Sequence, residues 1–311
     1  MLRIWRAVSH QLVSCGGRGR CLPLALLAAT LATPSAAEIC TLHDASDAKQ
    51  MELIGKLDKS PNAVHRHYTL EHSADPDLRS CQLVLTLGST AAERMIKRKG
   101  PVMHAMLRRE QFLAFYPQPP LHPRGAVYSD TPLRDYMSLI DATLPNRRKI
   151  LVFGSERTQS LYTRLRAEAQ RVGRELEMLS HQDDVLFDEL LRHHAGEDVV
   201  LLILPDPHVF NSDTARPIII AAYQRAVPMV TYAPSLVRAG SLMAVYRTLD
   251  DQAAELERHI TSWKDNGRLP SAAYASGYSI SINYLLARAM RLTIPTKQAV
   301  LDTMRRVDSD E

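Results

Sequence analysis

The sequence predicts an α/β protein of two doubly wound, Rossmann-like lobes, each a mostly parallel sheet covered by helices on both faces. Short apolar segments alternate with segments of helical periodicity along most of the chain. Two of them, residues 81–87 (CQLVLTL) and 199–204 (VVLLIL), are largely or wholly apolar without a polar face, as expected of strands buried on both faces. A proline-rich passage at residues 117–123 separates two such blocks, which indicates a linker or crossover between lobes.

The order of the segments gives the predicted domains. The first block is expected to hold strands at 39–43, 65–70, 81–87 and 101–106 and helices at 44–59 and 91–99. The second is expected to hold helices at 133–144, 158–172, 185–194 and 214–225 and strands at 149–153, 175–179, 199–204 and 228–232. Parallel strands joined by helices use right-handed crossovers. We therefore predict lobe 1 at 38–124, lobe 2 at 125–244, and a return to lobe 1 within about 245–311.

Residues 1–37 have the pattern of a secretory signal peptide. Four arginines precede an apolar run at 22–32, and Ser35-Ala36-Ala37 supplies the small residues of a cleavage site. The run is too short to cross about 30 Å of hydrocarbon. We predict cleavage before Glu38, export to the periplasm and no membrane-spanning segment in the mature chain; the alternative is a retained N-terminal anchor.

Cleavage changes the charge balance of the chain. The full sequence has 38 Lys and Arg against 34 Asp and Glu, and removing four arginines leaves the mature chain near neutral. Its apparent basicity is therefore no argument for a nucleic-acid partner, and none is expected.

Two cysteines stay in the mature chain. Cys15 and Cys21 leave with the signal peptide, whereas Cys40 and Cys81 enter an oxidising compartment. A pair of cysteines in an exported protein suggests one disulfide. The alternative is that both are small buried apolar residues.

Hydroxyl and carboxyl side chains follow three predicted strands. Ser89 and Thr90 open a helix after 81–87, Ser155 follows 149–153, and Asp206 follows 199–204. Exposed amides at a helix start suit an anion such as a carboxylate, and Asp206 suits an amine or a sugar hydroxyl. The alternatives are that the hydroxyl residues cap helices and that Asp206 is only a turn residue.

Enzyme and metal signatures are absent from the sequence. There is no Gly-x-Ser-x-Gly nucleophile elbow and no glycine-rich phosphate loop. His65 and His67 would share one face of a strand, but a metal site needs three or four converging ligands. Trp263 lies in a predicted helix at 250–264 and is expected in the core. We therefore expect no catalytic residue, metal or cofactor.

From about 125 to 295 the chain resembles the type-I periplasmic substrate-binding proteins of ABC importers, in particular the tryptophan- and tyrosine-binding components. The matching stretches are LIDATLPNRRKILVFGSERTQS, VVLLILPDPHVF, IIIAAYQRAVPMVTYAPSLVRAGSL and YSISINYLLARAMRLTIP, with LVLTLGSTAAERMI in the first lobe. The resemblance implies two lobes joined by three crossovers that close on a small ligand, and a permease and an ATPase as partners. The residues that match its binding positions are Ser89, Thr90, Ser155, Ser160 and Asp206.

The sequence departs from this family at three places. The first lobe has room for one strand–helix unit fewer between Glu38 and Cys81, residues 106–109 (MLRR) replace an Asp-Pro element, and Gln252 replaces a usual glycine. We expect a binding component for a small amino-acid-like or carboxylate solute. The alternative is a degenerate relative that acts as a ligand sensor or as an accessory subunit of an envelope partner.

Overall fold

A computed structural model gives the structure of the chain and describes residues 38–60, 64–70, 77–155, 159–180, 187–194, 196 and 198–309. The predicted signal peptide and its cleavage site lie outside these residues. Within the described part of the chain, no helix combines the length and the apolar character that a membrane span requires.

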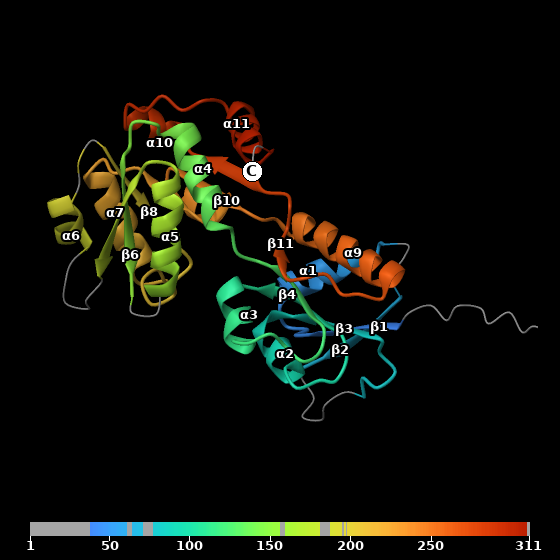
Figure 1. Cartoon of the computed structure of the whole chain (residues 1–311). Helices are drawn as coiled ribbons and strands as arrows, with labels where there is room; N and C mark the ends of the chain where they lie inside the picture. The colour runs from blue at the N-terminus through green and yellow to red at the C-terminus, as the bar shows by residue number, and fades with distance from the viewer. Residues whose placement is uncertain are drawn as a thin grey trace, which may run out of the picture. The chain divides into compact units, whose positions relative to one another are not determined.

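The first sheet has six strands in the order β11-β5-β4-β3-β1-β2, and every neighbouring pair is parallel. These strands are β1 (Glu38–His43), β2 (Val64–Thr69), β3 (Leu83–Leu87), β4 (Val102–Leu107), β5 (Arg124–Tyr128) and β11 (Ala273–Tyr274). Its helices are α1 (Ala48–Leu57), α2 (Gly88–Met95), α3 (Arg109–Phe115) and α9 (Leu249–Asn266). Alternate strand residues pack on α1 and α9 on one face and on α2 and α3 on the other, because successive side chains point to opposite faces (Figure 1).

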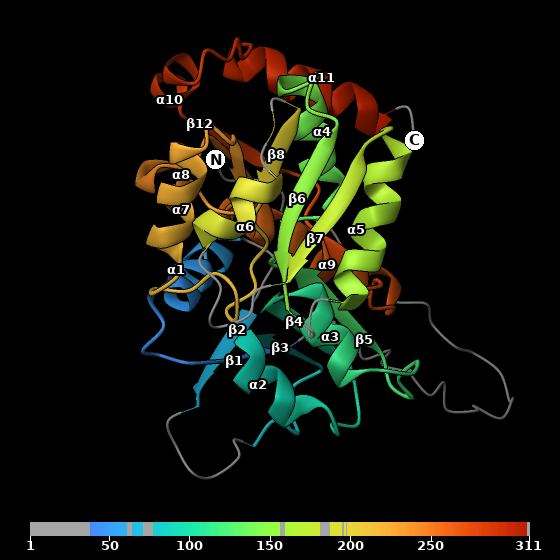
Figure 2. The same ribbon diagram turned by 90° about the vertical axis from the view of Figure 1, so that its left-hand side faces the viewer.

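The second sheet also has six strands, in the order β12-β10-β9-β8-β6-β7, and only β12 runs antiparallel to its neighbour. The strands are β6 (Lys149–Gly154), β7 (Glu175–Ser180), β8 (Val199–Leu202), β9 (Met229–Thr231), β10 (Met243–Tyr246) and β12 (Ser279–Ile282). The helices are α4 (Leu133–Thr143), α5 (Gln159–Arg171), α6 (Phe187–His194), α7 (Ala215–Gln224), α8 (Pro234–Ala239), α10 (Tyr284–Ala289) and α11 (Lys297–Ser309). One face packs on α4, α5 and α11 and the other on α6 and α7 (Figure 2).

The chain passes between the two sheets three times. The passages follow β5, β10 and β11, at residues 129–132, 247–248 and 275–278. We call the first sheet with its helices the first lobe, and the second sheet with its helices the second lobe. Residues 125–128 pair with β4 and so extend the first lobe beyond the predicted boundary at 124, whereas residues 279–309 return to the second lobe.

The sheet of the first lobe has as many strands as that of the second. The family-based expectation of one strand–helix unit fewer between Glu38 and Cys81 stays a prediction, because part of the segment between β2 and β3 lies outside the described residues. Trp263 is 8% exposed within the core under α9, as predicted.

The predicted disulfide joins β1 to the segment just before β3. The Cα atoms of Cys40 and Cys81 are 5.7 Å apart, within the usual range for a disulfide. Both residues are also buried in the apolar layer between the sheet and α2. The prediction of a bond is confirmed, and the alternative correctly described the apolar surroundings of the two residues.

Candidate functional site

A cavity of about 180 Å³ lies where strands of both sheets end. We call it the cleft cavity, and it is lined by Arg108, Ser129, Asp130, Thr131, Tyr136, Pro205, Tyr232, Tyr246 and Arg247. A second cavity of about 50 Å³ adjoins it and shares Arg108, Asp130, Thr131, Tyr136 and Pro205. Ligands of doubly wound sheets bind at the carboxyl ends of the strands, and the lining residues follow β4, β5, β8, β9 and β10.

Arg108 enters the cleft cavity because the end of β4 is irregular. The register between β4 and β5 shifts between Ala105 and Leu107, and Met106 has a φ of 57°. Bulges of this kind change the direction of the side chains that follow them. Arg108 Nη1 donates a hydrogen bond of 2.5 Å to the carbonyl oxygen of Pro205, so the first lobe contacts the second at the cavity wall.

The other polar groups of the cleft cavity come from the passages and from the strands of the second sheet. Asp130 Oδ1 accepts a 2.9 Å hydrogen bond from the backbone N–H of Arg109. Burial raises the pKa of the Asp130 carboxyl, and this hydrogen bond only partly offsets the effect. Burial also raises the pKa of Tyr232, against the charge of Arg108. The cavity thus combines a guanidinium, a carboxyl and tyrosine hydroxyls, which suits a small polar solute.

A buried ion pair fixes the passages beside the cavity. Arg247 Nη1 binds Asp135 Oδ2, and the two side chains are only 3% and 2% exposed. Arg247 Nε donates a 3.2 Å hydrogen bond to the carbonyl oxygen of Ala275 in the third passage. Thr131 in the first passage donates to the carbonyl oxygen of Val245 at 3.4 Å. We call Arg247 and Asp135 the hinge pair, because Arg247 lies in the second passage and also binds the third.

Two of the predicted site residues meet at the ends of neighbouring strands. Ser155 Oγ donates a 2.9 Å hydrogen bond to Asp206 Oδ2, and the backbone N–H of His208 donates to Asp206 Oδ1 at 2.9 Å. Asp206 is only 6% exposed, and neither it nor Ser155 lines the cleft cavity. Contacts of this kind are also expected of a turn residue, and a ligand role for Ser155 and Asp206 stays a prediction. Pro205, next to Asp206, does line the cavity.

The remaining predicted residues lie elsewhere. Ser89 and Thr90 are exposed in the first turn of α2, and no side chain caps that helix from its N-cap position, Leu87. Neither lines the cleft cavity. The side chain of Ser160 lies outside the described residues. A ligand role for these residues stays a prediction.

Sequence reasoning did not identify Arg108, Asp130, Tyr232 or Tyr246. The sequence did contain a signal for Arg108, because this residue lies two positions after the predicted strand at 101–106 and within the stretch 106–109 that replaces the family's Asp-Pro element.

Of the two histidines in β2, the structure describes the side chain of His67 and not that of His65. Among the described residues, no group of three His, Cys, Asp or Glu side chains is placed to hold a metal ion. His67 Nε2 lies 3.2 Å from Asp58 Oδ1 at the surface.

Several solved structures are similar to this chain. One is a ligand-free, open substrate-binding protein with adhesive properties from Clostridium difficile, with 12% identity, a TM-score of 0.66 and coverage of 85% of this chain and 97% of that one. A second is an ABC domain in complex with L-Trp from Streptococcus pneumoniae, with 16% identity, a TM-score of 0.56 and coverage of 86% and 98%. A third is a conserved domain protein from Vibrio cholerae, with 18% identity, a TM-score of 0.57 and coverage of 86% and 98%.

No protein-family model and no curated protein sequence matches the chain. At these identities the likeness shows the fold. The chain has the two-lobed fold of type-I periplasmic binding proteins, as the sequence predicted.

Proposed function

We propose that this protein is an exported solute-binding protein that captures a small amino-acid-like or carboxylate solute in the cleft cavity. One observation carries the proposal: polar side chains from strand ends of both sheets line a single cavity, at which Arg108 of the first lobe contacts Pro205 of the second. A solute held there contacts both lobes at once. This is how a two-lobed binding protein couples binding to closure.

The chemistry of the lining supports this ligand class. The Arg108 guanidinium offers charge-assisted hydrogen bonds to a carboxylate. Asp130 and the hydroxyls of Ser129, Tyr232 and Tyr246 offer partners for an amine or a hydroxyl group. We infer binding without catalysis, because these groups suit recognition and the sequence contains no nucleophile motif.

An ABC permease and an ATPase are the partners we propose, by analogy with importer binding proteins. The competing role of a sensor or accessory subunit relied on a first lobe with a missing unit. The first sheet has six strands, as many as the second, which does not favour a reduced first lobe. We therefore favour the importer role.

A thermal-shift screen of the protein against amino acids and small carboxylates tests the binding function. A compound that binds the native state selectively raises the melting temperature. For each hit, titration calorimetry of Arg108→Gln should show at least about tenfold weaker binding, or about 1.4 kcal/mol, because a charge-assisted hydrogen bond is lost.

Arg94→Gln is the matched control, since Arg94 is exposed on α2 and does not line the cleft cavity. Its affinity should equal that of the wild type. A flat response across the library, or equal affinity in the Arg108 variant, contradicts the proposal.

A further inference from the structure

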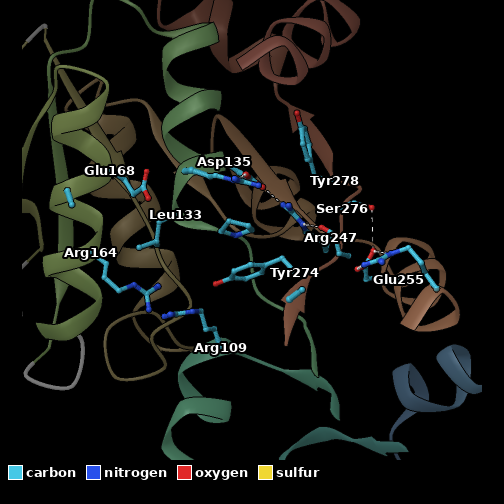
Figure 3. Close-up of a pocket in the computed structure, with 16 residues that line it drawn as sticks. Arg109, Leu133, Asp135, Arg164, Glu168, Arg247, Glu255, Tyr274, Ser276 and Tyr278 are labelled. Carbon is cyan, nitrogen blue, oxygen red and sulfur yellow. Dashed lines mark hydrogen bonds and ion pairs between the residues drawn. The ribbon is translucent and has the colours of Figure 1, made fainter. Parts of the chain in front are cut away.

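A second, larger cavity of about 830 Å³ lies beside the passages (Figure 3). We call it the arginine basin. Its walls come from the start of α4, from α5 and α9, from Arg109 at the start of α3, and from residues 273–278 of β11 and the third passage. It shares only Arg247 with the cleft cavity, so the two cavities have different linings.

The basin lining carries an excess of positive charge. Five arginines line it against three carboxylates, and each carboxylate already has a cationic partner. Asp135 pairs with Arg247, Glu255 pairs with Arg258, and Glu168 lies 3.2 Å from Arg171. The lining carboxylates therefore leave positive charge uncompensated at Arg109 and Arg164.

Arg109 and Arg164 converge on one carboxylate oxygen outside the lining. Arg164 Nη1 contacts Glu110 Oε1, and Arg109 Nη1 lies 3.7 Å from the same atom. All three side chains are between 33% and 43% exposed, so they are open to exchange of partners with solutes. Two guanidinium groups on one carboxylate leave one net positive charge, which an external anion can neutralise.

Tyr274 adds a neutral donor at the same corner of the basin. Figure 3 shows its hydroxyl end turned toward the Arg109 and Arg164 side chains. Burial raises the pKa of Tyr274, and Asp130 raises it further against the charges of the two arginines. The hydroxyl therefore keeps its proton at neutral pH and can donate it in a hydrogen bond.

We propose that the arginine basin is a second ligand site, which binds a small oxyanion through Arg109, Arg164 and Tyr274. Glu110 occupies the two guanidinium groups when the site is empty and is displaced by the incoming phosphate or carboxylate group. Guanidinium groups match both kinds of oxyanion because they present parallel N–H donors. The proposal goes beyond the cleft cavity and does not depend on what binds there.

Titration calorimetry of the full chain with inorganic pyrophosphate and, separately, with citrate tests this site at constant ionic strength. We expect saturable binding of at least one probe, and the probe that binds identifies the phosphate or the carboxylate class. Arg164→Gln and Arg109→Gln should each bind at least about tenfold more weakly. Glu110→Gln should bind several-fold more tightly, because the internal competitor loses its charge.

Arg166→Gln provides the matched control. Arg166 is exposed on the same helix as Arg164 and does not line the basin. Its replacement by glutamine removes the same charge as Arg164→Gln. Its affinity should equal that of the wild type. The proposal is overturned if neither probe binds, if Arg166→Gln weakens binding as much as Arg164→Gln, or if Glu110→Gln fails to strengthen it. Because a misfolded variant cannot gain affinity, the Glu110 result separates a binding role from a structural one.

Discussion

The hinge pair provides a quantitative test of how the passages are held. Its two side chains are almost completely buried, at 3% and 2% exposed. Asp135→Leu leaves Arg247 as a buried charge without this partner, which costs about 3–5 kcal/mol. Arg247→Met leaves Asp135 with Arg134 Nε at 3.7 Å from its Oδ1, so the charge penalty is smaller there. The same variant also loses the hydrogen bond to Ala275, worth about 1 kcal/mol.

The double variant separates the interaction from the two individual losses. Replacing both members by apolar residues removes both charges, and such replacements are often nearly neutral. We expect the double variant to be at least about 2 kcal/mol more stable than the sum of the single losses predicts.

Urea unfolding of the wild type, the two single variants and the double variant measures this coupling. Lys56 and Asp250 serve as the control pair, because they form an ion pair with 26% and 79% exposed side chains. Lys56→Met and Asp250→Asn should couple by no more than about 1 kcal/mol. If the loss in the double variant of the hinge pair equals the sum of the two single losses to within about 0.5 kcal/mol, the expected coupling is absent.

Two further predictions concern the first lobe. The disulfide closes a loop with a sequence separation of 41, so Cys40→Ala/Cys81→Ala should lose about 4 kcal/mol of unfolding free energy in urea; an unchanged midpoint would contradict this. Burial, aided by Arg124, lowers the pKa of His104 to about 3 from 6.5, so only the unfolded chain takes up its proton between these pH values. The free energy of unfolding should fall by about 1.4 kcal/mol per pH unit as the pH drops through this window, and it should depend less steeply on pH in His104→Gln. Equal pH dependence in the wild type and the variant would exclude His104 as the cause of the loss.

The sequence predicted most of the buried strands, because a run of apolar residues is stable mainly where its side chains are buried in a core. Residues 199–204 are one example, and the structure places β8 there. It did not predict β5, because the prolines just before it indicated an irregular passage. Arg124 also made this strand hard to predict, because a charged residue is not expected at a buried position. Its side chain is buried, and its guanidinium donates hydrogen bonds to the carbonyl oxygens of Gly100 and Ile96.

The candidate site was harder to predict than the fold. The sequence identified strand ends as the site, but it did not show which side chain at each end faces the cavity. Asp206 satisfies its carboxylate with Ser155 and a backbone amide, whereas Arg108 turns into the cavity after the irregular end of β4. That direction depends on a backbone φ of 57° at Met106, a methionine that nothing in the sequence marks as unusual.

The threefold passage of the chain has a consequence for how the protein folds. The sheet of the first lobe is covered by Leu256, Ile260 and Trp263 of α9, and that of the second by Val300 and Met304 of α11. A chain that emerges from its N-terminus can therefore complete neither core until its last quarter is available. A fragment that ends before α9 would expose the apolar faces of both sheets. We expect both lobes to consolidate in one late cooperative step, with closely coincident unfolding transitions.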